Sequence, residues 1–147
     1  MAIVPGGGPF ADAVRTAQGQ LGFDDRLAHR LALDAMGRMA EVFCALEPRL
    51  SVAASPEAVA DALDGGRSAI WDPVALKAGH PDIAESWEVT SDSLALWLAT
   101  RLDAGRCILV KSANLPSETD PAILARDGLV DAAFPRFAAS YPGAILT

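Results

Sequence analysis

The sequence contains few cysteines, few aromatic residues and few basic residues. Cys44 and Cys107 are the two cysteines among 147 residues, too few and too far apart for a disulfide framework or a zinc site. Twelve Lys and Arg residues stand against nineteen Asp and Glu, which gives a formal net charge of -7, and no basic run is present. A nucleic-acid-binding surface needs clustered positive charge, so a nucleic-acid partner is not expected.

Long apolar runs are lacking as well. No stretch approaches the roughly 20 apolar residues that span a bilayer, and residues 1–6 lack the apolar core of a signal peptide. We therefore expect a cytoplasmic protein without a membrane partner. Hydrophobic residue types still make up 51% of the 147 residues, enough to fill a core. Because one domain typically takes about 100–200 residues, the sequence predicts a single domain over residues 1–147.

Short apolar segments alternate with amphipathic segments along the chain. Glycine and proline separate them, which is typical of strands and helices joined by tight turns. This order predicts an α/β fold in which the chemistry gathers at the carboxyl ends of parallel strands. Strands are expected at 2–5, 68–71, 107–110 and 144–146, and helices at 9–19, 27–46, 56–64, 91–103 and 134–139.

The strongest helical periodicity lies in residues 27–46, where apolar side chains recur at steps of three and four residues. The expected apolar face begins with Leu27 and Leu31 and closes at Leu46. His29 lies off this face, so we expect it at the surface or at an interface.

Three successive glycines, Gly6, Gly7 and Gly8, separate the first expected strand from the first expected helix. Successive glycines allow backbone N–H groups to point at one anion, and the positive end of the following helix favours a phosphate or a carboxylate. The segment matches neither a P-loop nor a dinucleotide-binding fingerprint. An anion-binding loop and a plain tight turn explain it equally well.

Two further positions carry charged side chains beside expected element ends. Asp92 follows Thr90 and Ser91 at the start of a helix. An ordinary N-cap is the simpler interpretation there, and an acid that orients lysines or a metal is the functional one. Lys111 follows the strand at 107–110, which is apolar throughout and therefore expected to be buried on both faces. This cation either meets a nucleotide phosphate or ends in solvent.

Taken together, these segments resemble the amino acid kinase family. The similarity lies in the order of four segments along nearly the whole chain. Within the family, the sequence looks most like the aminomethylfuran phosphate kinase type, which acts in methanofuran and methylofuran biosynthesis. The four segments are 4–12, 90–95, 108–111 and 128–131, and the pieces similar to that type are 25–36 and 86–92.

The resemblance implies a three-layer αβα sandwich of amino acid kinase type. Its N-terminal part would bind a small phosphorylated or carboxylated acceptor. By the resemblance, Gly6, Gly7 and Gly8 would hold the acceptor and the transferred phosphoryl group through backbone N–H donors, and Trp87 would bind the same substrate.

The resemblance also implies that ATP binds in the C-terminal part, with Mg²⁺ bridging its phosphates. Asp92 matches the acid that orders the catalytic lysines of the family. Arg136 falls near a position where some members place a catalytic lysine. Lys111, Ser112 and Asn114 match the strand-end loop at the nucleotide. No dedicated cluster of metal ligands is visible in the sequence.

One departure separates this sequence from the family. Members begin with a further strand and a turn that carries lysine and glycines, whereas here the strand before the glycine triplet comes first. We therefore expect a truncated domain that lacks the first βα unit and leaves a sheet edge exposed. It would also lack one cation for the transferring phosphate, and phosphoryl transfer depends on such charge stabilisation.

The departure leaves three explanations open: an altered kinase, an inactive family member, or a missing piece supplied by another chain or encoded upstream. The first hypothesis is an ATP-dependent phosphotransferase for a small phosphorylated or carboxylated acceptor, acting in furan cofactor biosynthesis. The alternative is a catalytically inactive kinase-fold subunit that works as a homo-oligomer or with a heteromeric partner chain.

Overall fold

A computed structural model describes residues 1–112 and 120–147 of the chain. These residues form two compact units, Met1–Trp87 and Glu88–Thr147, and each unit is described by itself. Both units combine helices with parallel strands, so the predicted α/β class is confirmed. The expectation of a single domain stays a prediction.

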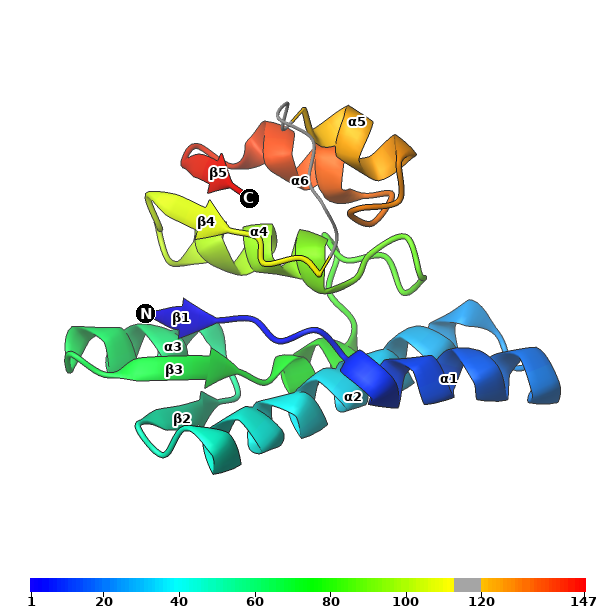
Figure 1. Cartoon of the computed structure of the whole chain (residues 1–147), viewed down its shortest axis with the longest axis horizontal. Coiled ribbons are helices and arrows are strands. Elements are labelled where there is room, and N and C mark those ends of the chain that lie inside the picture. The colour runs from blue at the N-terminus through cyan, green and yellow to red at the C-terminus, as the bar shows by residue number, and fades with distance from the viewer. Residues whose placement is uncertain (113–119) are drawn as a thin grey trace. The chain divides into compact units, whose positions relative to one another are not determined.

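The first unit is built on a three-stranded parallel sheet. β3 (Ser68–Trp71) is central, β1 (Ala2–Ile3) pairs with one side of it and β2 (Leu50–Ala53) with the other. The arrows of β1 and β3 point the same way in Figure 1, so the glycine triplet leaves the sheet at the edge where β3 also ends. β2 is not among the predicted strands, because a short apolar segment without alternation does not distinguish a strand from a connection.

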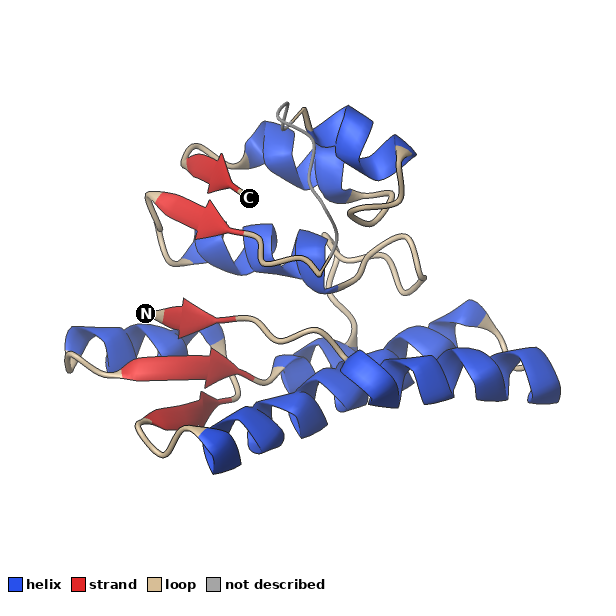
Figure 2. Cartoon of the chain, viewed as in Figure 1, coloured by secondary structure: helices blue, strands red, loops and turns tan. Residues whose placement is uncertain are grey.

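The helices of the first unit follow local capping rules. Asp24 caps the long second helix by accepting a hydrogen bond from the Leu27 N–H at 2.9 Å, which is a common role of aspartate before a helix. The first two helices pack along each other, as Figure 2 shows. Among the described residues no helix is both long enough and apolar enough to cross a bilayer. The helices are α1 (Gly8–Leu21), α2 (Asp25–Leu46), α3 (Pro56–Asp64) and the 3₁₀ helix η1 (Pro73–Ala78).

The buried face of α2 differs from the predicted one. Ala28, Leu33 and Met36 are buried, whereas Leu27 is 44% exposed and Leu46 is 76% exposed. Apolar residues lie on more than one side of this helix, so periodicity alone does not decide which side is covered. The strands, α1 and η1 pack against α2, and they cover the side that carries most of its alanines. The predicted face is therefore wrong at its two ends, Leu27 and Leu46.

The second unit combines a parallel pair of strands with helices. Leu96, Leu124 and Phe134 are fully buried at its centre. The Tyr141 hydroxyl donates to the Ala104 carbonyl oxygen at 2.6 Å and so ties the end of the unit to the connection after its first helix. The elements are α4 (Ser91–Arg101), β4 (Arg106–Ile108), α5 (Pro121–Arg126), α6 (Phe134–Ser140) and β5 (Ala144–Leu146).

Two features of this unit correct the sequence prediction. β4 is buried on one face only, because Cys107 is buried while Ile108 is exposed and Val110, beyond the strand, is 91% exposed. Packing covers the Cys107 side, since Cys107 belongs to the buried core of this unit, and within the described part of the chain β4 pairs with β5 alone. α5 lies in a segment expected to be a loop, although Asp120 caps it and Pro121 occupies its first turn.

Candidate functional site

Asp92 and Lys111 meet in the second unit. Asp92 lies in the first turn of α4, and Lys111 follows the end of β4. The Nζ of Lys111 donates to Oδ1 of Asp92 at 2.6 Å, and the two side chains are 20% and 16% exposed. A short charge-assisted hydrogen bond that is mostly out of water holds the ammonium group in one place. The structure therefore brings together two of the predicted site residues.

A third residue, Asp131, anchors the start of α4. Its Oδ2 accepts from the Thr90 N–H and from the Thr90 hydroxyl, both at 2.9 Å. The same oxygen accepts from the Ser93 N–H at 3.0 Å, and Oδ1 accepts from the Ser93 hydroxyl at 2.5 Å. Thr90 occupies the N-cap position, but its side chain makes no capping hydrogen bond. The predicted local cap is therefore wrong, because a carboxylate from the later part of the unit satisfies these N–H groups.

Sequence reasoning missed Asp131 as a site residue. The one available signal is its place at the end of the segment 128–131, which carries part of the family resemblance. Nothing in that segment tells which helix end the carboxylate reaches, because residues 128–131 are far from α4 in the sequence. Only the packing of the second unit shows that the Asp131 carboxylate reaches the start of the helix that carries Asp92.

Burial determines the electrostatics of Asp92. Removal from water raises the pKa of its carboxyl, the Lys111 ammonium lowers it, and the charge of Asp131 raises it again, so that it lies above its ordinary range. The backbone of Asp131 lowers the same pKa. Burial, and then the charge of Asp92, raise the pKa of the Cys107 thiol. The Asp92 carboxylate therefore lies partly out of water, where a negative charge is unfavourable unless a cation such as the Lys111 ammonium is beside it.

The glycine triplet lies between β1 and α1 in the first unit. Gly6 is exposed, Gly7 is the N-cap residue of α1, and Gly8 begins the helix with a φ of +51°, which favours glycine. A Cβ at Gly7 would lie 2.5 Å from the Cβ of Ala11 and 3.3 Å from the Cβ of Ala35. Packing thus requires glycine at one position and backbone conformation favours it at the next. Both interpretations of the triplet, a tight turn and an anion-binding loop, stay open.

Trp87 closes the first unit and is tied to α1. Its indole Nε1 donates to Oε1 of Gln18 at 2.7 Å, and the Arg15 guanidinium lies 4.4 Å from the ring centroid. The side-chain amide of Gln18 also donates to Oδ1 of Asp25 at 2.8 Å. These contacts hold the indole in one orientation. Its role in binding the acceptor stays a prediction.

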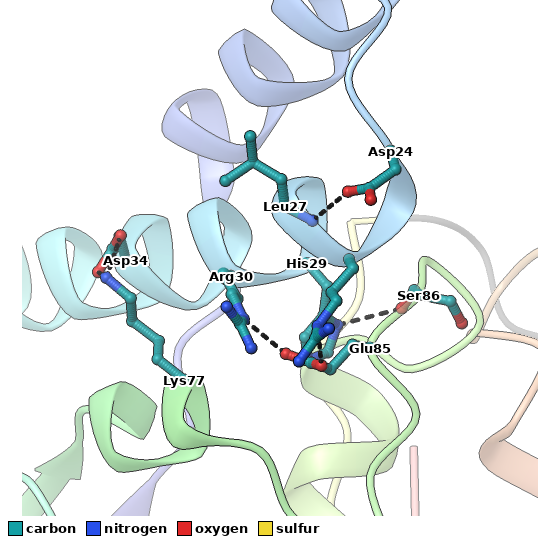
Figure 3. A network of polar contacts seen from close by, with 9 residues as sticks. Asp24, Leu27, His29, Arg30, Asp34, Lys77, Glu85 and Ser86 are labelled. Atoms are coloured by element: carbon teal, nitrogen blue, oxygen red, sulfur yellow. Dashed lines mark hydrogen bonds and ion pairs between the residues drawn. The ribbon is translucent and has the colours of Figure 1, made fainter.

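A polar network joins α2 to the loop that follows η1 (Figure 3). His29 is 3% exposed, and its Nδ1 lies 3.1 Å from the Ser86 carbonyl oxygen, so Nδ1 carries the donated proton. Glu85 accepts from Arg30 at 2.6 Å and from Arg26 at 2.7 Å. The hydrogen bond from Arg30 is the main cause that lowers the pKa of Glu85. The expectation of a surface histidine is wrong, because this loop covers its side of α2.

The sequence contains two lysines, and each is paired with an aspartate. Lys77 on η1 donates to both carboxylate oxygens of Asp34 at 2.7 Å (Figure 3). The side chains of that pair are 37% and 39% exposed, so it is more open to water than the pair of Lys111 and Asp92. Lys77 is therefore a matched reference for Lys111 in experiments.

Arg136 and Ser112 are the other predicted site residues of the second unit that the structure describes. Arg136 lies in α6 with its guanidinium 4.7 Å from the Phe137 ring centroid, and Ser112 is exposed beside Lys111. Asn114 lies outside the described residues. In residues 1–112 and 120–147, no group of three or more His, Cys, Asp or Glu side chains is placed to hold a metal ion.

The predicted site residues divide between the two units. The predicted acceptor-binding residues, the glycine triplet and Trp87, belong to the first unit. The predicted catalytic and nucleotide-binding residues that the structure describes belong to the second. Their individual roles stay predictions.

The sequence of the chain is related to that of a kinase. It is 32% identical over 111 residues to the (5-(aminomethyl)furan-3-yl)methyl phosphate kinase of Methanocaldococcus jannaschii. The matched region covers 73% of this chain and 49% of that kinase, so the chain spans about half the length of the curated relative it matches. No protein-family model matches the chain.

The fold is that of a solved kinase as well. The crystal structure of uridylate kinase from Archaeoglobus fulgidus matches 99% of this chain, and the match covers 75% of that chain, with a TM-score of 0.64 at 20% sequence identity. At this identity the likeness concerns the fold, and uridylate kinase has the amino acid kinase fold. The predicted resemblance is thereby confirmed: the chain has the fold of the amino acid kinase family and is a sequence relative of an aminomethylfuran phosphate kinase.

Proposed function

We propose that the chain is a phosphotransferase of kinase type, which moves a phosphoryl group from ATP to a small phosphorylated or carboxylated acceptor. The observation that carries the proposal is the partly buried ion pair of Lys111 and Asp92 after a strand end. A lysine that is oriented in this way suits the stabilisation of charge on a transferring phosphoryl group. The sequence relationship to a kinase supports the reaction class.

The reaction requires little covalent chemistry from the protein. An acceptor oxygen attacks the γ-phosphorus of ATP in line, the bond from this phosphorus to the β–γ bridging oxygen breaks, and ADP leaves with the electron pair. Negative charge is spread over the phosphoryl and leaving oxygens during the step. Lys111 would stabilise this charge, and Asp92 would keep the ammonium oriented, so that little reorganisation is needed during the reaction.

ATP is the phosphoryl donor in this proposal, and Mg²⁺ would neutralise charge between its phosphates. Lys111 and Ser112 would hold the ATP phosphates, because an ammonium and a hydroxyl are hydrogen-bond donors to phosphate oxygens. On the acceptor side, the N–H groups of Gly6–Gly8 would bind an anionic group, and Trp87 would contact the rest of the molecule. Arg136 would contribute a second cation.

The proposed acceptor is the phosphate monoester of a small aminomethylfuran. The support is the sequence relationship, since the relative is by name a kinase of such a phosphate. The product would be a diphosphate, and the proposal includes a role of the chain in methylofuran biosynthesis. ATP and a charged small molecule are both present in the cytoplasm, so the proposal includes a cytoplasmic location.

The test compares the two lysines of the chain. The purified protein is incubated with ATP, Mg²⁺ and (5-(aminomethyl)furan-3-yl)methyl phosphate, and ADP release and the ³¹P signal of a diphosphate are followed. We expect Lys111→Met to lower the rate by about 10²–10³-fold, as loss of a charge-stabilising donor does, and Lys77→Met to leave it unchanged. A wild-type chain that forms neither ADP nor diphosphate would contradict the proposal.

A second candidate is a kinase-fold subunit that works through association without catalysis. The observation that favours it is a group of apolar side chains on α2 that are each more than one-third exposed. A second copy of the chain or a heteromeric partner would cover such a surface. Light scattering of the wild type and of Phe43→Ser separates the cases, because an oligomer that dissociates in the variant supports association. The exposed side chains are Leu27, Val42, Phe43 and Leu46.

A further inference from the structure

We infer that Asp131 is a positioning residue for the ion pair: it holds the first turn of α4 so that the Asp92 carboxylate meets the Lys111 ammonium. The catalytic half of this inference rests on the proposed function. The structural half, that the geometry of the pair depends on Asp131, does not. Asp131 acts through Asp92 and is not itself assigned to the substrate.

The Asp131 carboxylate accepts hydrogen bonds from residues on both sides of Asp92 at the start of α4. It binds the backbone N–H and the hydroxyl of Thr90, and it binds the same two groups of Ser93. Four hydrogen bonds to one carboxylate use both of its oxygens. Because Asp92 lies between Thr90 and Ser93, its backbone cannot move without breaking some of these hydrogen bonds.

Asp131 also acts on the charge of Asp92. Its carboxylate raises the pKa of Asp92 and its backbone lowers it, while the Lys111 ammonium binds Oδ1 of Asp92 at 2.6 Å. The Asp92 side chain is thus held by the cation of Lys111, and the side chain of Asp131 fixes the helix that carries it.

A helix start of this kind does not require a distant carboxylate. Thr90 is at the N-cap position, and a threonine hydroxyl can accept a hydrogen bond from a first-turn N–H. Here that hydroxyl donates to Asp131 instead. A second negative charge beside Asp92 is unfavourable and raises the Asp92 pKa. An arrangement that forgoes the local cap and adds like charge is typical of a functional site rather than of a helix end alone.

The structural test uses the small number of lysines. In protein labelled with ¹⁵N-lysine, Lys111 and Lys77 give one Nζ signal each, and Lys77→Arg assigns them. Hydrogen exchange at an ammonium is slow when an ion pair holds it away from water. We expect Asp131→Asn to speed exchange at Lys111 several-fold and to leave Lys77 unchanged. The asparagine oxygen can still accept from Thr90, so this variant is chosen to keep the fold.

The control is Asp24→Asn. Asp24 caps α2 through one hydrogen bond and lies in the first unit. This substitution replaces a helix-capping carboxylate by an amide in the same way, and asparagine caps a helix about as well as aspartate, so exchange at Lys111 should not change. Unchanged exchange at Lys111 in Asp131→Asn, or an equal change in Asp24→Asn, overturns the structural half of the inference.

The kinetic test separates positioning from stability. At a temperature well below the melting temperature of the variant, we expect Asp131→Asn to lower kcat by about 10- to 100-fold, as misplacement of a reacting group does, with KM for ATP unchanged. A merely structural role would lower the melting temperature and leave kcat intact at that temperature, and this result overturns the catalytic half. A wild type without transfer activity refutes the proposed function, while the exchange measurement still decides the inference.

Discussion

The Lys111 ammonium lies 2.6 Å from the Asp92 carboxylate, and each side chain is at least four-fifths buried. Withdrawing two charges from water carries a desolvation cost that surface pairs avoid, so such a pair is a poor means of stabilising a fold. It is an effective means of holding one ammonium in one orientation. This balance between stability and orientation leads to the first two predictions.

We expect Asp92→Asn to abolish transfer and to leave the fold intact. An amide does not hold an ammonium as a carboxylate does, so the rate should fall at least about 100-fold. The raised pKa of Asp92 means that the folded protein accepts a neutral side chain there more readily than a charged one. The variant should therefore melt at the wild-type temperature or above it at neutral pH. Assays of ADP release and circular dichroism melting check both points, and unchanged turnover would refute the role of Asp92.

The stability of the wild type relative to Asp92→Asn should depend on pH. At a pH below about 3.9, the ordinary pKa of an aspartate, both chains carry a neutral side chain at this position. Because the folded-state pKa of Asp92 is raised, the wild type loses relative stability as the pH rises from the unfolded to the folded pKa. The free energy of unfolding of the variant, relative to that of the wild type, should rise over this pH window and stay constant above it. Urea unfolding at a series of pH values measures the free energy of unfolding of the variant minus that of the wild type. A value that falls as the pH rises contradicts the prediction.

Gly37→Ala should destabilise the first unit although it lies inside a helix. A Cβ at Gly37 would lie 2.8 Å from Oδ1 of Asp72, and this carboxylate is held by the Val74 N–H at 3.0 Å. Overpacking of this kind costs about 1–3 kcal/mol, which outweighs the gain of up to about 1 kcal/mol from replacing a helical glycine.

Gly19→Ala is the matched control for Gly37→Ala. Gly19 also lies in a helix, α1, and a Cβ there would meet nothing within 4 Å. We expect this variant to gain up to about 1 kcal/mol in the free energy of unfolding. Urea unfolding of the two variants should therefore give changes of opposite sign, and a gain in both would refute the close contact with Asp72.

His29→Leu should destabilise the first unit by about 1–3 kcal/mol. It removes the donor to the part-buried Ser86 carbonyl oxygen, and an acceptor that loses its partner inside a fold costs about this much. His29→Asn places an amide donor near the position of Nδ1 and should recover part of the loss. Chemical unfolding measures both variants, and equal stability of His29→Leu and the wild type would show that the bond contributes nothing.

Much of the local structure was predictable from short stretches of sequence. Asp24 before α2 and Ser55 with Pro56 before α3 are start signals that act within three residues, and both side chains accept hydrogen bonds from N–H groups of the first helical turn. The charged side chains at Asp92 and Lys111 were predictable as site candidates, because they stand beside the ends of apolar segments. Their contact was not predicted, because the resemblance assigned Asp92 to the catalytic lysines of the family in general and Lys111 to the nucleotide.

The sequence alone determined where most helices and strands form, because caps, prolines and apolar periodicity act between neighbouring residues. It did not determine which side of α2 is buried, since that helix carries apolar residues on several sides and its neighbours in space choose among them. Nor did it reveal that Asp131 accepts hydrogen bonds from the start of α4, a contact between residues far apart in the chain. Such contacts depend on the packing of whole elements, so only the tertiary structure decides them.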